Sequence, residues 1–203
     1  MNIEKITSYE MDQNCYLVYD ENGTGFLIDP GADIMKILKA MEKSGANITH
    51  ILLTHCHYDH IYSVNELRRG RILVASAECS KHIGERSMNL SASCDDPFIV
   101  APADRILADG EEMKIGTMCV KMIKTPGHTS CSVCYLTDGA LFSGDTLFKR
   151  NVGRWDLPTG NNTALVKSIR ERIFTLPLKT KVYPGHGFAT DIEYEKKFNL
   201  YLS

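Results

Sequence analysis

Five of the seven histidines in the chain lie in three short segments that resemble metal-binding loops in composition. The first segment, residues 54–60, has the sequence THCHYDH and holds three histidines and an aspartate. The other two, residues 126–128 and 184–186, each place one histidine after a Pro-Gly pair. Imidazole and carboxylate groups are the usual ligands of zinc and related cations. The spacing therefore predicts a metal centre, and the number of donors favours two ions.

Each candidate ligand follows the end of a predicted strand. Short apolar runs at residues 51–53, 118–124, 140–143 and 181–183 predict strands, and they precede His55, His128, Asp145 and His186 in that order. Functional groups commonly lie on loops that a rigid sheet positions. We expect these four loops to meet at one sheet edge.

The remaining pattern alternates short strands with amphipathic helices. Residues 15–18 and 25–28 predict a hairpin that turns at an Asn-Gly pair. Apolar spacing predicts helices over 34–44, closed by Gly45, and over 162–175 and 192–202, with Glu195 on a solvated face. Residues 84–104 are irregular and are predicted to form either a lid beside the metals or a long connection, with the lid favoured. No linker or low-complexity segment divides the chain, so we expect one domain over residues 1–203.

Composition argues against several classes of function. Of the 203 residues, 43% are apolar and 24% charged, as in soluble globular proteins, and the net charge is −2. Without a basic stripe, nucleic-acid binding is not expected. No apolar run approaches the roughly 20 residues of a membrane span, and the N-terminus lacks the pattern of a secretory signal. We therefore expect a cytoplasmic protein with a small-molecule substrate, and the oligomeric state is left open.

The donors predict hydrolytic chemistry. Within residues 54–60, His55 and His57 would face one ion, while Asp59 and His60 would face its neighbour. Two neighbouring ions need a bridging anion, and Asp145 in Ser-Gly-Asp-Thr is the candidate. Such a centre lowers the pKa of bound water towards about 7 and stabilises a developing oxyanion, which gives Asp59 and Asp145 catalytic roles.

Three further residue types need interpretation. Asp29, in an Asp-Pro-Gly sequence, is predicted either to order a ligand imidazole or to form a turn. The seven cysteines are odd in number and irregular in spacing, which favours free thiols in a reducing compartment. Cys131 and Cys134 form a C-x-x-C pair, which would be a redox motif at the start of a helix. The flanking residues predict a strand instead, which would point the two thiols to opposite faces, so ordinary buried thiols are expected. Cys56 is predicted to pack or to orient its neighbours.

Two histidines lie outside the three segments. His50 and His82 are interpreted as structural, because a lone histidine is more often structural than catalytic.

The combined motifs resemble the metallo-β-lactamase superfamily. Residues 54–60 match T-H-x-H-x-D-H, 126–129 match P-G-H-T, 144–148 match G-D-T-L-F and 184–187 match P-G-H-G, in the order of the family. The resemblance spans nearly the whole chain. It implies an α/β protein with an αββα sandwich, in which two mixed β-sheets lie face to face between outer helices and a dimetal site lies at one sheet edge.

The resemblance also implies which residues bind each ion. The first ion would take His55, His57 and His128, the second would take Asp59, His60 and His186, and Asp145 would bridge them. Zinc is the expected metal, with iron or manganese as alternatives. In having an aspartate as the bridging ligand, the chain resembles the glyoxalase II, lactonase and phosphodiesterase branches of the family.

Within the family the chain most resembles short glyoxalase II-like hydrolases, through residues 145–148, 153–158 and 184–190. Arg154 matches the position of a basic residue that contacts glutathione, with an ordinary ion pair as its alternative role. The glyoxalase II C-terminal helical extension is not expected in this chain. The resemblance therefore implies a thioester or ester hydrolase that uses a metal-bridging hydroxide.

The alternative to a thioester or ester hydrolase is a persulfide dioxygenase with one iron on His55, His128 and Asp145. A lactonase or a phosphodiesterase is less expected than either of these two. Phe148 and Trp155 are expected either to line the pocket or to lie in the core.

Overall fold

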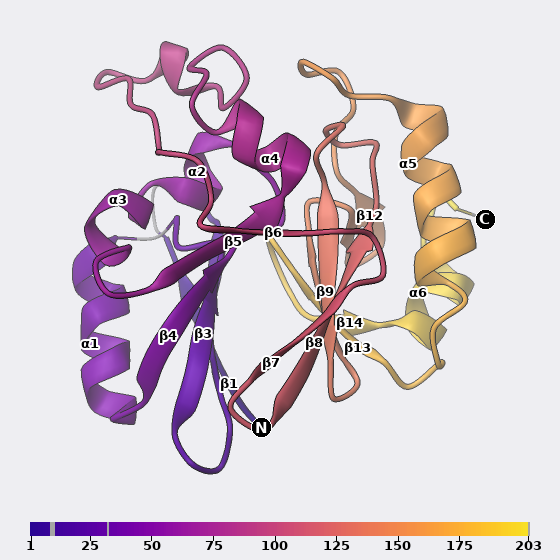
Figure 1. Cartoon of the computed structure of the whole chain (residues 1–203). Coiled ribbons are helices and arrows are strands. Elements are labelled where there is room, and N and C mark those ends of the chain that lie inside the picture. Colours follow the sequence, from indigo (N-terminus) through magenta and orange to yellow (C-terminus); the bar gives the residue numbers. More distant parts are fainter. Residues whose placement is uncertain (9–10, 32, 203) are drawn as a thin grey trace.

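The computed structural model describes residues 1–8, 11–31 and 33–202. Two six-stranded sheets lie face to face, and helices cover the outer face of each (Figure 1). The N-terminal half of the chain builds one sheet and the C-terminal half builds the other. The predicted αββα sandwich is confirmed.

The first sheet has the order β1-β2-β3-β4-β5-β6. Its strands are β1 Asn2–Thr7, β2 Asn14–Tyr19, β3 Thr24–Ile28, β4 Asn47–Leu52, β5 Ile72–Ser76 and β6 Arg105–Leu107. The predicted hairpin is formed by β2 and β3, which pair antiparallel, whereas β3 to β6 pair parallel. Strand β2 is buried on both faces: Cys15 and Leu17 face the outer helices, and Tyr16 and Val18 face the second sheet.

The second sheet has the order β14-β13-β10-β9-β8-β7. Its strands are β7 Glu112–Ile115, β8 Met118–Lys124, β9 Val133–Thr137, β10 Ala140–Gly144, β13 Lys181–Pro184 and β14 Thr190–Asp191. Only β10 and β13 pair parallel among the described strands of this sheet. A small hairpin of β11 Leu147–Phe148 and β12 Asn151–Val152 follows β10.

The helices begin and end largely where local signals direct. Helix α1, Ile34–Ser44, begins at Asp33, whose carboxylate accepts a hydrogen bond from the Met35 N–H, and ends at Gly45 with a left-handed φ of 65°. The other helices are α2 Tyr58–Ile61, α3 Val64–Leu67, α4 Ala77–His82, α5 Asn162–Ser168 and α6 Ile192–Phe198. Helix α5 continues through one π-helical turn, Ile169–Ile173, so the helix predicted over 162–175 has a changed pitch in its second half.

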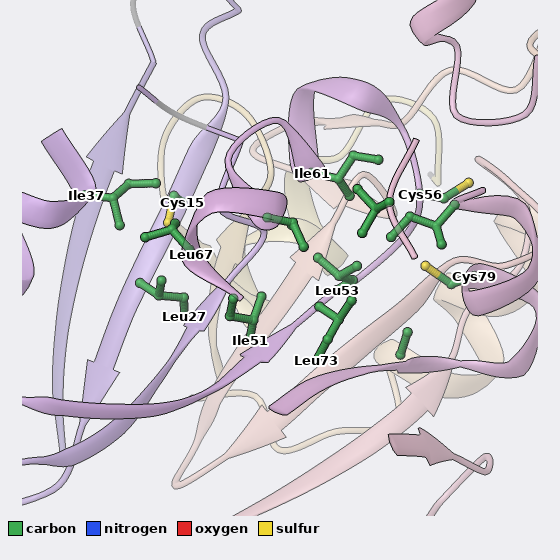
Figure 2. Packing of buried hydrophobic residues seen from close by; sticks show 14 of the residues in the cluster. Cys15, Leu27, Ile37, Ile51, Leu53, Cys56, Ile61, Leu67, Leu73 and Cys79 are labelled. Carbon is green, nitrogen blue, oxygen red and sulfur yellow. The ribbon is translucent and has the colours of Figure 1, made fainter. Parts of the chain in front are cut away.

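The buried side chains form three hydrophobic clusters. Aromatic side chains, including Tyr16, Phe26 and Phe142, fill the space between the sheets. A second cluster packs the first sheet against α1, α3 and α4 (Figure 2), and a third packs the second sheet against α5 and α6. Among the described residues, no helix is both long and apolar enough to cross a bilayer.

One surface prediction was wrong. Glu195, assigned to a solvated helix face, is only 1% exposed. Its carboxylate accepts hydrogen bonds from the Thr190 hydroxyl at 2.6 Å, the Arg150 backbone N–H at 2.9 Å and the Asn199 amide at 2.8 Å. It therefore holds the β11–β12 hairpin against α6. The sequence did not reveal this role, because the charged residues that neighbour Glu195 in the sequence are exposed.

Candidate metal centre

The histidines and aspartates of the four motifs meet where the two sheets face each other. The first sheet supplies the THCHYDH segment, which runs from the loop after β4 into α2, and the second supplies the loops after β8, β10 and β13. Donor atoms of His55, His57 and His128 form one group in which all lie within 4.8 Å of one another. Donor atoms of Asp59, His60 and His186 form a second such group.

Asp145 lies between the two groups. Its Oδ1 is 3.3 Å from His60 Nε2. Its Oδ2 is 3.5 Å from His128 Nε2 and 3.6 Å from His186 Nε2. The two carboxylate oxygens thus reach members of both groups, which is the placement that a bridging ligand requires.

Glycines allow these close approaches. A Cβ on Gly185 would lie 2.3 Å from Asp145 Oδ1 and 2.6 Å from His60 Cε1, so no side chain fits there. Gly144 has a φ of 48°, and a Cβ would meet the Thr54 hydroxyl at 2.2 Å. Both sequence positions therefore require glycine so that the loops after β10 and β13 can approach the β4 loop.

Asp29 orders the second group. It is 1% exposed and has a left-handed φ of 46°. Its carboxylate accepts hydrogen bonds from the Thr54 backbone N–H at 2.7 Å, the Thr54 hydroxyl at 2.5 Å and His60 Nδ1 at 2.9 Å. A proton held on His60 Nδ1 leaves Nε2 with its lone pair towards Asp59 and Asp145. Asp29 also stands in the turn after β3, so it has both of the roles predicted as alternatives.

Backbone carbonyls orient two further imidazoles. His128 Nδ1 donates to the Arg154 carbonyl at 2.7 Å, and His186 Nδ1 donates to the Asp12 carbonyl at 3.0 Å. Each bond turns the Nε2 atom of its ring towards Asp145. This ordering of ligands by carbonyls is typical of metal-binding histidines.

The polar atoms of the cluster fit bound cations. Nε2 of His55, Nε2 of His60 and Oδ1 of Asp145 are buried and have no hydrogen-bond partner among the described residues. A buried polar atom without a partner costs about 1–3 kcal/mol. Because these lone pairs point into a cluster of imidazoles and carboxylates, divalent ions would satisfy them.

Electrostatics support the same conclusion. Burial lowers the pKa of His55 well below its usual value and that of His57 to about 4, so both rings are neutral at pH 7. Burial alone would raise the pKa of Asp145, but the nearby His60, His128 and His186 outweigh it and hold the pKa well below its usual value. For His55, His57 and Asp145 these are the protonation states that metal binding needs. At His60 burial would lower the pKa, but Asp145, Asp59 and Asp29 outweigh it and raise the pKa, so an ion bound there must displace a proton.

A pocket of about 380 Å³ opens beside the second group. It is lined by Asp12, Phe148, Lys149, Arg150, Asn151, His186, Gly187 and Phe188. The Phe148 ring meets the His186 ring edge-on at 5.9 Å, so Phe148 lines the pocket, whereas Trp155 packs against the third core cluster. Sequence reasoning missed Lys149 and Arg150, although this basic pair directly follows the G-D-T-L-F motif.

Arg154 does not line this pocket. Its guanidinium binds the Asp156 carboxylate through two hydrogen bonds of 2.7 and 2.8 Å, and both side chains are 62% exposed. The geometry is that of the surface ion pair expected as the alternative, while the carbonyl of the same residue positions His128. A direct contact of its side chain with substrate stays a prediction.

Part of the segment 84–104 packs against the metal-binding loop. The Asn89 carbonyl accepts the Tyr58 backbone N–H at 2.7 Å, and the Met88 carbonyl accepts the Cys56 thiol at 3.7 Å. Asn89 is fully buried, and its amide donates to the Ile83 and Phe98 carbonyls. These bonds fix the segment beside the THCHYDH loop; its action as a lid stays a prediction.

Comparisons with known proteins agree with this geometry. Residues 9–186 match the family model described as metallo-beta-lactamase superfamily. Hydroxyacylglutathione hydrolase GloC of Haemophilus influenzae is 31% identical, over 100% of this chain and 99% of that protein. The crystal structure of BLEG-1 B3 metallo-beta-lactamase is 32% identical, with a TM-score of 0.95 over the full length of both chains.

A further solved structure, ETHE1 from Myxococcus xanthus, is 30% identical and covers 98% of this chain and 84% of that chain, with a TM-score of 0.81. The donor set, the αββα architecture and these likenesses agree. The chain belongs to the metallo-β-lactamase superfamily.

Proposed function

We propose that this protein is a metal-dependent hydrolase that cleaves a thioester or ester. The observation that carries the proposal is the position of Asp145, whose oxygens reach both donor groups. A complete second group, with Asp59, His60 and His186 together, favours two ions over one. The likeness to hydroxyacylglutathione hydrolase GloC supports a thioester among the possible substrates.

In this proposal each donor has a defined task. His55, His57 and His128 would hold one ion, Asp59, His60 and His186 would hold the other, and Asp145 would serve both. When bound, two divalent ions supply a hydroxide at neutral pH and polarise a substrate carbonyl. Zinc is the proposed metal, and iron or manganese would accept the same donors.

The pocket suggests what the substrate carries. Lys149 and Arg150 place positive charge at its rim, while Phe148 and Phe188 offer apolar surface beside His186. A substrate with a carboxylate at one end and an acyl group at the other would match this arrangement. Arg154 can add a further cationic contact only if its guanidinium leaves Asp156.

The experiment compares purified protein with Asp145→Asn across thioester, ester, lactone and β-lactam substrates, each after metal removal and reconstitution with zinc. We expect an S-acylglutathione or related thioester to be cleaved, and the variant to lose about a hundredfold or more in kcat. Asp109→Asn is the control, because its carboxylate pairs with Arg172 and neither residue belongs to the donor groups or lines the pocket. Undiminished hydrolysis by Asp145→Asn would contradict the proposal.

The likeness to ETHE1 supports a second candidate. A persulfide dioxygenase would use one iron held by His55, His128 and Asp145, and would leave the second group without a metal. Metal analysis of protein purified without chelators separates the two. A single iron per chain with oxygen uptake on glutathione persulfide would favour the dioxygenase, and two ions with thioester hydrolysis would favour the hydrolase.

A further inference from the structure

A separate cluster of metal-binding side chains lies outside the two donor groups, and the proposed reaction does not use it. Donor atoms of Cys56, His82 and Cys131 lie within 4.8 Å of one another. Cys56 and Cys131 are 1% and 2% exposed, and their sulfurs are 3.7 Å apart. The three residues come from three different segments: the loop after β4, the end of α4 and the loop after β8.

The sulfur separation matches shared coordination of a cation. At a zinc–sulfur distance of about 2.3 Å, two sulfurs on one tetrahedral zinc lie about 3.8 Å apart. The His82 ring supplies the third donor, and no described residue hydrogen-bonds it. Two thiols and an imidazole on separate segments are the donors of a structural zinc site.

A third cysteine lies near these donors. Cys79 precedes His82 by three residues on α4, so both side chains lie on one face of the helix. The Cys79 side chain is fully buried in the same core cluster. Figure 2 shows Cys56 and Cys79 at the same end of that cluster. Its sulfur does not belong to the group whose donor atoms all lie within 4.8 Å of one another, so the described side chains supply three donors, and water would take the fourth position of a tetrahedral ion.

We propose that Cys56, His82 and Cys131 form an additional site for zinc, separate from the dimetal centre. On binding, the thiols of Cys56 and Cys131 release their protons to solvent. Two thiolates and a neutral imidazole balance the charge of the zinc ion, so the buried site carries no net charge. A buried site without net charge avoids the desolvation cost of an unpaired ion.

The location gives this zinc a structural purpose. Cys56 lies between His55 and His57, and Cys131 follows His128 by three residues. An ion held by both cysteines would join the two loops that carry the first donor group, and would tie them to α4. It would thereby fix a loop of the first sheet to a loop of the second.

Cobalt titration of the reduced, metal-free protein tests the site without any activity assay. Thiolate ligands give cobalt an intense charge-transfer band in the near ultraviolet, whereas a centre made of imidazoles and carboxylates does not. We expect three cobalt ions per chain and a thiolate band. Cys131→Ser should bind two cobalt ions and lose the band, and His82→Ala should weaken binding at the thiolate site by roughly tenfold or more.

Cys15→Ser is the matched control, since Cys15 is also fully buried in the same core cluster. It should keep three ions and the band. Because Cys131→Ser could fail to fold, the decisive measurement is on the unmodified protein. Absence of a thiolate band at cobalt saturation in that protein would overturn the proposal, as would a band that persists undiminished in folded Cys131→Ser.

Discussion

Changing Asp29 to asparagine removes one negative charge but almost no volume, and it should weaken binding of the second metal ion. The Asp29 carboxylate accepts three hydrogen bonds, one of them from His60 Nδ1. An asparagine oxygen can still accept from the Thr54 N–H, but its NH₂ group then faces His60. Two facing donors would force the His60 proton to Nε2, the atom that faces Asp145.

The expected magnitude follows from these contacts. Loss of a partner that orients a metal-binding histidine costs about 10–100-fold in metal affinity, or roughly 1.4–2.7 kcal/mol. Leaving one buried donor without an acceptor lowers the free energy of unfolding by a further 1–3 kcal/mol or so. Because the first donor group does not contain His60, only one of the two ions should be lost.

Zinc stoichiometry against a competing chelator measures this effect, with thermal unfolding in parallel. Asp20→Asn is a matched control: Asp20 is also 1% exposed and accepts three backbone hydrogen bonds, from Asn22, Thr24 and Thr117. It should lose stability yet bind both ions. If Asp29→Asn binds two zinc ions with unchanged affinity, Asp29 does not set the His60 tautomer and the reasoning is wrong.

Three other changes have defined outcomes. Gly185→Ala should lower zinc affinity at least about tenfold, because its Cβ would press on Asp145. In Gly187→Ala the Cβ meets open space, so the strain of its left-handed φ of 74° should cost stability while both ions stay bound; equal zinc binding by the two variants would contradict this. Hydrogen bonds from backbone N–H groups, that of Thr117 foremost, lower the pKa of Asp20, so its stabilisation is complete above the usual pKa of about 3.9 and is lost as pH falls through the lower folded value. The melting temperatures of native protein and Asp20→Asn should therefore differ at pH 7 and converge in acid, and a constant difference would exclude the mechanism. Glu195→Gln should lower the free energy of unfolding by about 1–3 kcal/mol in denaturant titrations; a wild-type value would show that the buried carboxylate is dispensable.

The sequence was most informative where a local signal and the packing agree. Helix α1 has the predicted bounds, because its apolar spacing lies between a capping Asp33 and a left-handed Gly45. Strand β1 was not predicted, because its alternation of Ile3 and Ile6 with charged residues is weak and only pairing with β2 specifies it. The π-helical turn after α5 likewise has no Pro or Gly to mark it.

For the site, sequence reasoning located the donor atoms and one orienting group, Asp29, but not the backbone carbonyls that orient two other imidazoles. Histidines and aspartates beside Pro-Gly and Gly-Asp pairs are distinctive in composition, so the structure brings together the seven residues that the motifs singled out. The carbonyls of Asp12 and Arg154 that orient His186 and His128 carry no such signature, since every residue has a carbonyl. The group of Cys56, His82 and Cys131 went unnoticed because its members are distant in sequence.

The division of the donors between the two sheets has a consequence for how the protein acquires its metals. Four donors follow β4 in the first half of the chain, and three follow strands of the second half. Neither half can offer both complete groups before the sheets dock. Each group is complete only when the sheets are docked, so bound ions would stabilise the contact between the two halves. Cleavage in the connection around residues 108–111 should yield two fragments that reassociate more tightly with zinc than without it.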